Sequence, residues 1–97
     1  MKKTIPSKPT AASQLEELPN IGPAMASDLH IIGIDHPTQL AGKDAFALYD
    51  KLCIVSGKKH DPCVIDVFLS AIYFMEKGEA RPWWKFTAER KARLQRD

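Results

Sequence analysis

The stretch that most constrains the fold runs from Val64 to Met75, where all but two residues are apolar. Asp61 and Pro62 precede it as a helix N-cap and a first helical residue, and Gly78 follows as a helix end. A helix that is apolar almost all round must be covered on every side. The sequence therefore predicts a central helix against which the other elements pack. Asp66 lies inside this stretch, and we expect its carboxylate to bond a tryptophan N–H or a partner's backbone.

Apolar spacing, capping residues and the placement of Gly and Pro predict further helices at about 13–18, 23–32, 37–42, 44–55 and 87–95. Ser13 and Glu16 have the spacing of a capping box at the start of the first. One apolar stripe predicts the buried face of the helix at 44–55: Ala45, Leu48, Tyr49, Leu52 and Val55. No segment alternates as a strand does, so the predicted fold class is all-α, with five to six helices.

A short turn joins the first two predicted helices, at Leu18-Pro19-Asn20-Ile21-Gly22-Pro23. Pro19 stops the preceding helix, and Pro23 suits the first position of the next one. We expect Gly22 to adopt a backbone conformation that a side chain would resist. A turn that leads into a helix N-terminus presents N–H groups outward, and this arrangement suits a phosphate or another anion.

The net charge of +2 is unevenly distributed along the 97 residues. Residues 1–10 carry three lysines and no acid, and residues 85–97 carry five basic and two acidic residues. The part between them, 11–84, has six basic and ten acidic residues. Basic ends on an acidic body suit weak contact with nucleic acid, and they also suit solubility alone. The length predicts a disordered lead-in at 1–12, one domain at 13–84 and a basic, helical extension at 85–97.

The helix–hairpin–helix motif of many DNA repair and recombination proteins is similar to one pattern in this chain, Leu15-x-x-Leu18-Pro19-Asn20-Ile21-Gly22-Pro23-x-x-Ala26-x-x-Leu29. The resemblance implies a tandem domain whose second, degenerate hairpin lies at residues 56–62. It also implies that hairpin N–H groups contact phosphates without reading sequence. The implied contacts are Asn20, Ile21, Gly22, Ala24 and Met25 on the first hairpin, with Lys58, Lys59 and His60 on the second.

A longer stretch resembles a bacterial family of pathogenicity-locus or mitomycin-resistance proteins. The residues that carry it are Leu52-Cys53-x-x-x-Gly57-x-x-His60-Asp61-Pro62-Cys63-Val64-x-Asp66-Val67-Phe68, Ala71-x-Tyr73-Phe74 and Pro82-Trp83-Trp84. This resemblance covers nearly all of residues 15–87. It implies a helix–hairpin–helix domain with a DNA-linked role and no established enzymatic activity.

These observations predict a non-catalytic, sequence-nonspecific DNA-binding module. Residues 13–36 contain no Lys or Arg, so a phosphate at the first hairpin meets amides and the helix dipole without a cation. The alternative is a protein-interaction adaptor that uses the hairpin only as a scaffold and contacts its partner through Trp83 and Trp84. A stacking platform for single-stranded nucleic acid is another interpretation of the two tryptophans, and packing over the core is a third.

The two cysteines suggest a reduced thiol chemistry rather than a disulfide framework. Cys63 near a helix start, beside Lys58 and Lys59, is a candidate reactive thiol in a stress or redox protein, but a buried apolar thiol at the start of the core helix is the favoured interpretation. Cys53, His60 and Cys63 match no common metal pattern, and no nucleophile–base set is visible, so we expect no metal, no cofactor and no catalysis. No export signal or membrane-spanning stretch is apparent, which predicts a cytoplasmic location.

Overall fold

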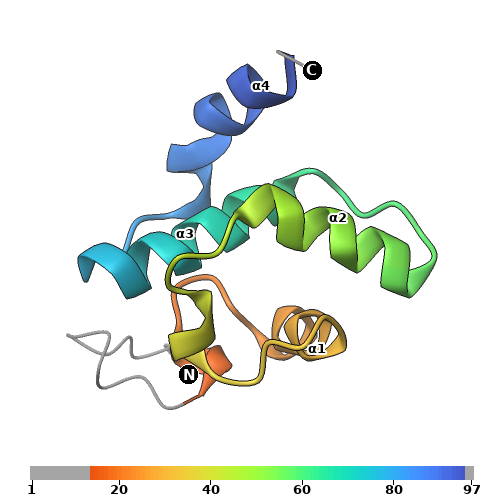
Figure 1. The fold of residues 1–97 in the computed structure, drawn as a ribbon. Coiled ribbons are helices and arrows are strands. Elements are labelled where there is room, and N and C mark those ends of the chain that lie inside the picture. Colours follow the sequence, from red (N-terminus) through yellow and green to blue (C-terminus); the bar gives the residue numbers. More distant parts are fainter. Residues whose placement is uncertain (1–13, 96–97) are drawn as a thin grey trace.

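Residues 14–95 are described in the computed structural model, and within them four α-helices and three 3₁₀ helices form, with no strand (Figure 1). The α-helices are α1 (Pro23–Ile31), α2 (Ala45–Ser56), α3 (Cys63–Lys77) and α4 (Thr87–Gln95). The 3₁₀ helices are η2 (Leu15–Glu17), η3 (Pro37–Leu40) and η4 (Trp83–Phe86). The all-α prediction is confirmed. The elements expected at 13–18 and 37–42 are 3₁₀ helices of three and four residues.

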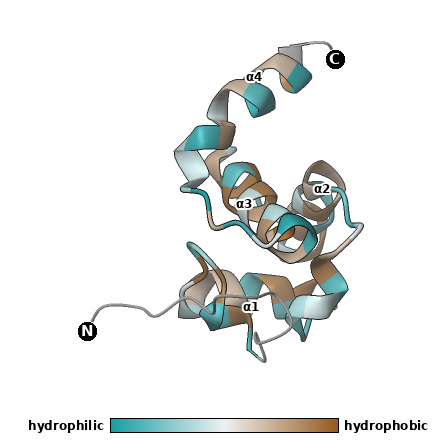
Figure 2. Ribbon diagram, turned by 90° about the vertical axis from the view of Figure 1, so that its left-hand side faces the viewer, coloured by the Kyte–Doolittle hydropathy of each residue, from teal (hydrophilic) through white to brown (hydrophobic). Residues whose placement is uncertain are grey.

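The predicted central helix is α3, which packs against α2, α4, η3 and η4. Figure 1 shows α3 across the middle of the molecule, with α1 on one side and α4 on the other. Hydrophobic ribbon segments gather between α1 and the α2–α3 pair (Figure 2). Eight α3 residues are buried, Ile65, Asp66, Val67, Phe68, Ser70, Ala71, Ile72 and Phe74. No helix within residues 14–95 has the length and apolarity needed to cross a membrane.

Most helix ends follow from local residues. The Phe46 N–H donates to Asp44 Oδ1 at 2.9 Å and caps α2, which ends at Gly57 with a left-handed φ of 72°. Gly78 ends α3 in the same way, with φ 74°. The capping box predicted for Ser13 and Glu16 is wrong in register. Ser13 lies outside the described residues, and the Gln14 N–H donates to Glu17 Oε1 at 3.0 Å instead.

The prediction that Val55 is buried is wrong. Val55 is 52% exposed and its neighbour Ile54 is 79% exposed, whereas Ala45, Leu48, Tyr49 and Leu52 are buried as expected. Figure 1 shows the reason, because the last turn of α2 extends beyond the start of α3. The apolar stripe of α2 therefore continues past the point where α3 covers it.

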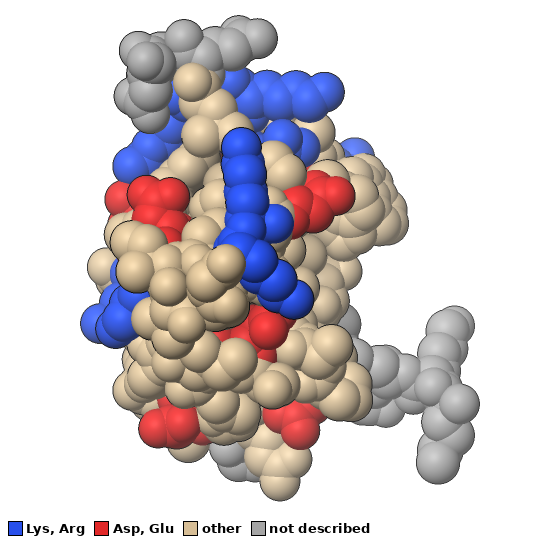
Figure 3. Space-filling view, turned by 90° about the vertical axis from the view of Figure 1, so that its right-hand side faces the viewer, with Lys and Arg blue, Asp and Glu red and all other residues tan. Residues whose placement is uncertain are grey.

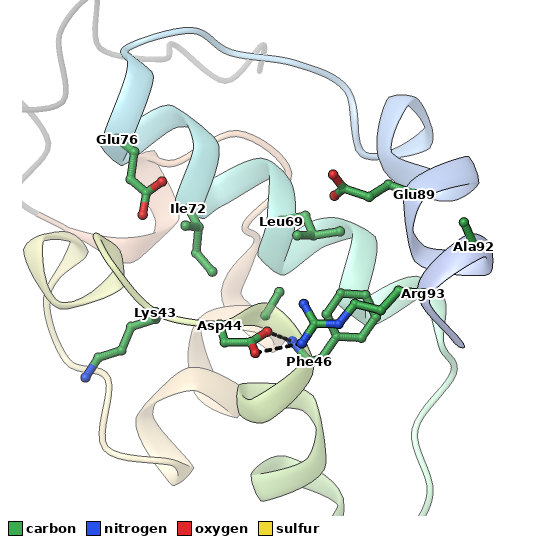
Figure 4. A pocket seen from close by; sticks show the side chains of 10 residues that line it. Lys43, Asp44, Phe46, Leu69, Ile72, Glu76, Glu89, Ala92 and Arg93 are labelled. Carbon is green, nitrogen blue, oxygen red and sulfur yellow. Dashed lines mark hydrogen bonds and ion pairs between the residues drawn. The ribbon is translucent and has the colours of Figure 1, made fainter. Parts of the chain in front are cut away.

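Two ion pairs fasten α4 to the rest of the domain. Arg90 Nε donates to the fully buried Asp66 Oδ1 at 2.9 Å, and Thr87 Oγ1 donates to Asp66 Oδ2 at 2.8 Å. The expectation that Asp66 bonds a tryptophan or a partner's backbone is therefore wrong. Nearer the end of α4, Arg93 pairs with Asp44 at 2.9 Å and lies over the Phe46 ring, 4.1 Å from its centroid (Figure 4). The segment predicted as a basic extension thus contributes contacts to the domain.

Candidate nucleic-acid interface

The hairpin turn, residues 18–23, is held by its apolar side chains and one reversed backbone angle. Leu18 and Ile21 are buried, and the Ile21 N–H donates to the Leu18 carbonyl at 3.2 Å. The left-handed residue of this turn is Asn20, with φ 66°. Within residues 14–95, it is the non-glycine residue that has a positive φ. Gly22 is extended, with φ −95° and ψ −175°, so the prediction that it needs a special conformation is wrong. Asn tolerates the left-handed region because its short polar side chain bonds locally.

The Asn20 side chain ties the hairpin turn to two distant segments. Its Nδ2 donates to Ser70 Oγ at 3.0 Å and to the Arg81 carbonyl at 3.4 Å. Ser70 Oγ in turn donates to the same carbonyl. The amide nitrogen of Asn20 is therefore engaged within the protein. In the sequence, Ser70 stands out only as a polar residue within an apolar stretch, and nothing there predicts its bond to Asn20.

The first turn of α1 leaves backbone donors open. The N–H groups of Gly22, Ala24 and Met25 bond no acceptor among residues 14–95. The Ile21 N–H was also predicted to face a phosphate, but it is used inside the turn. A Cβ built on Gly22 would meet no atom within 4 Å, and Gly22, Pro23 and Ala24 are exposed. Three N–H groups at an uncapped, uncrowded helix start can approach an anion closely.

The basic loop, residues 56–62, is built differently. Lys58 and Lys59 are exposed, whereas His60 is half-buried and engaged on three sides. Its ring Nε2 bonds Ser56 Oγ at 2.8 Å, its N–H donates to Cys53 Sγ at 3.5 Å, and its carbonyl accepts from the Tyr49 hydroxyl. Burial, with Cys53 next to it, raises the pKa of Tyr49 to about 12, so this hydroxyl stays a donor. His60 therefore shapes the loop, and the lysines are its open charges.

The start of α3 offers no comparable set of donors. The Cys63 N–H donates to Asp61 Oδ1 at 2.8 Å, the Val64 N–H to the Asp61 carbonyl at 3.0 Å, and the Ile65 N–H to the Pro62 carbonyl at 2.9 Å. The bond from the Cys63 N–H holds the pKa of the Asp61 carboxyl below its usual range. An internal carboxylate therefore occupies the position that a phosphate would take.

The surroundings of Cys63 act against a thiolate. Its hydrogen bond to Asp61, burial and the negative charge of Asp61 raise the pKa of the Cys63 thiol, and Arg90 opposes this only in part. The direction is opposite to the one predicted from the helix start and the nearby lysines. Among residues 14–95, no three His, Cys, Asp or Glu side chains are grouped so that they could hold a metal ion.

The one basic residue found beside the hairpin turn within residues 14–95 is Arg81, and its guanidinium is already paired. On the face drawn in Figure 3, Lys and Arg gather over the middle and upper parts, whereas the lower end, at the level of α1, shows Asp and Glu. Arg81 is the basic residue tied to the turn through its carbonyl. Its guanidinium lies 4.5 Å from the centroid of the Tyr73 ring and pairs with Glu79 at 3.1 Å. The turn has amides without a free cation beside them.

The two tryptophans have different environments. Trp83 is half-buried and packs against the core, whereas Trp84 is 59% exposed. Their rings meet edge to face with centroids 5.8 Å apart. Trp84 also lines a groove of about 250 Å³ that we call the turn–η4 groove, together with Pro19, Asn20, Ala80, Arg81 and Pro82. This groove is mostly apolar and begins at the hairpin turn.

A larger hollow, of about 640 Å³, lies between α2, α3 and α4 (Figure 4). Leu69 and Ile72 form an apolar part of its wall, and Glu76 and Glu89 stand near them. Glu76 Oε2 accepts from the Gly42 N–H at 2.7 Å, and Arg93 is paired across the hollow. The residues that line this hollow include no Ser, Thr, Cys or His.

Comparison with known proteins gives the family of the chain. The profile of a family described as "Pathogenicity locus" matches residues 8–92. A protein of Streptomyces lavendulae described as "Mitomycin resistance protein McrB" is 39% identical over 82 residues, which cover 84% of this chain and 78% of that protein. No solved structure matches significantly.

Proposed function

The chain belongs to the pathogenicity-locus family, and we propose that it is a non-catalytic module that binds DNA without reading its sequence. In this proposal the hairpin turn and its two flanking helices form a helix–hairpin–helix motif. The entry to α3 is the second, degenerate hairpin of the same kind. Two free cysteines, Cys53 and Cys63, support a reducing, cytoplasmic location.

The observation that carries the proposal is the set of open donors at the start of α1. The N–H groups of Gly22, Ala24 and Met25 have no acceptor within residues 14–95, and Gly22 has no Cβ to keep a ligand away. Gly22 is not needed for its own backbone angle, because extended backbone suits any residue. Close approach of a ligand to the chain is then a physical reason for glycine at this position. Phosphate oxygens bind such groups independently of base sequence.

In this proposal the positive charge for DNA binding comes from the basic loop and not from the hairpin turn. Lys58 and Lys59 on the basic loop are exposed, and the loop contains one acid, Asp61, which is engaged with α3. Neutralising phosphates releases counterions, so each lysine that reaches the DNA steepens the salt dependence of binding. The arrangement favours weak binding with a moderate salt slope.

A protein-interaction adaptor is the alternative function, and the acidic surroundings of the hairpin turn favour it. A third hypothesis, a thiol-based redox protein centred on Cys63, is less favoured, because the hydrogen bond to Asp61 raises the pKa of that thiol. The DNA proposal and the adaptor alternative are separated by direct binding.

The test is a titration of the full chain with labelled DNA between about 50 and 200 mM salt. We expect weak binding that falls with salt and is lost in Gly22→Glu, because the new carboxylate would stand before the open amides of α1. Ala47→Glu is the matched control, since it adds the same charge at an exposed position on α2.

Deleting residues 85–97 is not a suitable control. Phe86 and Arg90 from this region are buried, and Arg90 neutralises Asp66. Absence of binding at 50 mM salt, or equal losses in Gly22→Glu and Ala47→Glu, would contradict the proposed hairpin contact.

A further inference from the structure

We propose that the turn–η4 groove binds one unpaired nucleobase, stacked on Trp84, while the adjoining phosphate lies at the open amides of α1. This inference rests on the proposed function and names its ligand more narrowly, as a nucleic acid with an exposed base. Such a base occurs in a single strand, at a frayed end or at a gap.

The first argument is the construction of the groove. One wall comes from the hairpin turn, with Pro19 and Asn20, and the other comes from the segment before and within η4, with Ala80, Pro82 and Trp84. The two walls are held together by the bonds that Asn20 and Ser70 make to the Arg81 carbonyl. The groove is therefore formed before any ligand arrives, and a flat apolar group gains contact without ordering the protein.

The second argument is the support of the Trp84 ring. Trp84 is exposed, yet its edge-to-face contact with Trp83 fixes it to a ring that packs on the core. Phe86, three residues after Trp83, is buried and meets Tyr73 with ring centroids 5.7 Å apart, which anchors the other end of η4. An exposed indole on an anchored 3₁₀ helix is a rigid stacking surface, and every base has a face that can stack on it.

The third argument is the spacing between the groove and the amides. Asn20 lines the groove, and Gly22, the first open N–H, is two residues further along the chain. Two Cα–Cα steps span at most about 8 Å, which is on the scale of one nucleotide. A base in the groove and its own or neighbouring phosphate at α1 can therefore be contacted together.

The same geometry selects against a duplex in this groove. Paired bases stack on one another and show only their edges, so they present no face to Trp84. Open amides beside the groove favour an anionic chain over an ordinary apolar peptide. A protein partner at Trp84 is the competing outcome of the test.

The test uses the two tryptophans of the chain as reporters. In Trp83→Phe, which keeps an aromatic ring at the half-buried position, Trp84 is the only tryptophan. The full-length variant is titrated with a labelled oligothymidine of roughly eight nucleotides, and separately with a blunt duplex. We expect Trp84 fluorescence to be quenched along with the rise in oligonucleotide anisotropy. Duplex binding should leave the fluorescence nearly unchanged.

Trp84→Ala in the otherwise native chain measures the contribution of stacking. Loss of one base–aromatic stack should weaken oligothymidine binding about tenfold and duplex binding less than about twofold, with Trp84→Tyr restoring most of the loss. Bound oligothymidine with unchanged Trp84 fluorescence would overturn this inference and leave the proposed function standing. Unchanged oligothymidine affinity in Trp84→Ala would also overturn it. If neither nucleic acid binds, both the proposed function and this inference fail.

Discussion

The starts of α1 and α3 solve the same physical problem in opposite ways. Each helix begins with N–H groups that have no partner within the helix. At α3 the Asp61 carboxylate and two backbone carbonyls accept the first three N–H groups of the helix. The first turn of α3 also carries an acid, Asp66. At α1 the N-cap is Gly22, which has no side chain to offer, and the first turn has no acid. One helix start is closed by the protein itself and the other is left open.

This difference separates the amides from the cations. The closed start follows Lys58 and Lys59 in the chain, whereas the open start lies in the stretch 13–36, which has no Lys or Arg. The neighbouring Arg81 is paired with Glu79. A ligand that used both would have to be long enough to reach from the start of α1 to the basic loop. The comparison favours a polyanion over a small free anion as the ligand.

The largest expected effect on the free energy of unfolding comes from removing the buried carboxylate of α3. Asp66→Asn should destabilise the domain by about 3 kcal/mol, because it leaves the Arg90 guanidinium without its charge partner in a buried site. Urea unfolding followed by circular dichroism measures this loss. The control is Asp44→Asn, which removes an exposed partner of Arg93 but keeps a side chain able to cap α2, and should cost less than about 1 kcal/mol. Similar losses in the two variants would contradict a special role for the buried pair.

The next effect concerns the residue that reverses each turn. Asn20→Ala should cost about 2 kcal/mol, since alanine in the left-handed region is strained and the bonds to Ser70 and Arg81 are lost. Asn20→Gly makes the hairpin turn resemble the basic loop, where Gly57 is left-handed, and should cost about 1 kcal/mol. Thermal and urea unfolding compare the two. If glycine is as damaging as alanine, the backbone angle is not what Asn20 supplies.

A third variant transfers the closed arrangement to α1. Gly22→Asp should cap the helix and raise stability by a few tenths of a kcal/mol, while it lowers DNA affinity about tenfold, or ~1.4 kcal/mol. Gly22→Asn occupies the same amides without the charge, so it should also lower the affinity, but less than Gly22→Asp does. A Tm measurement shows the capping in each variant, and a DNA titration shows its cost in affinity. Native affinity in both variants would show that the open amides do not face DNA.

The smallest expected effect is at Asp61. Asp61→Asn removes the carboxylate that raises the pKa of the Cys63 thiol, so this pKa should fall towards its ordinary value of 9.0. Because the folded-state pKa is raised, the neutral thiol stabilises the native chain below pH 9, and this contribution is lost as the pH rises through the folded value. The variant should show a smaller alkaline loss of stability. The rate of thiol alkylation against pH measures the shift, and Cys53→Ser in both chains isolates the Cys63 signal. An unchanged profile would mean that Asp61 does not control this thiol.

Helix positions were predictable because their signals are local. Asp44, Gly57 and Gly78 act through bonds and backbone angles within a few residues, and each stands where the sequence placed it. The face of α2 was predictable except at Val55, because helical periodicity does not show where the partner helix starts. The division of roles between Asn20 and Gly22 also escaped prediction, since both residues suit a left-handed angle.

The site was less predictable because its bonds join distant segments. Asp66 meets Arg90 across 24 residues, and Asn20 meets Arg81 across 61. The sequence marked Asp66 and Ser70 as polar residues in an apolar helix, but nothing in it identified their partners. It predicted phosphate contacts at the N–H groups of Ile21, Gly22, Ala24 and Met25. The Ile21 N–H is used in the turn, and the contacts at the other three stay a prediction.

The bonds of Asn20 and Ser70 to the Arg81 carbonyl have a consequence for local unfolding. The hairpin turn and α3 both bond the segment that leads into η4, since Asn20 Nδ2 and Ser70 Oγ donate to the same Arg81 carbonyl. Opening of the hairpin turn removes one of these two bonds, so we expect the turn and this segment to be coupled in local unfolding. A ligand that holds the hairpin turn closed should then slow amide hydrogen exchange before η4, some sixty residues further along the chain.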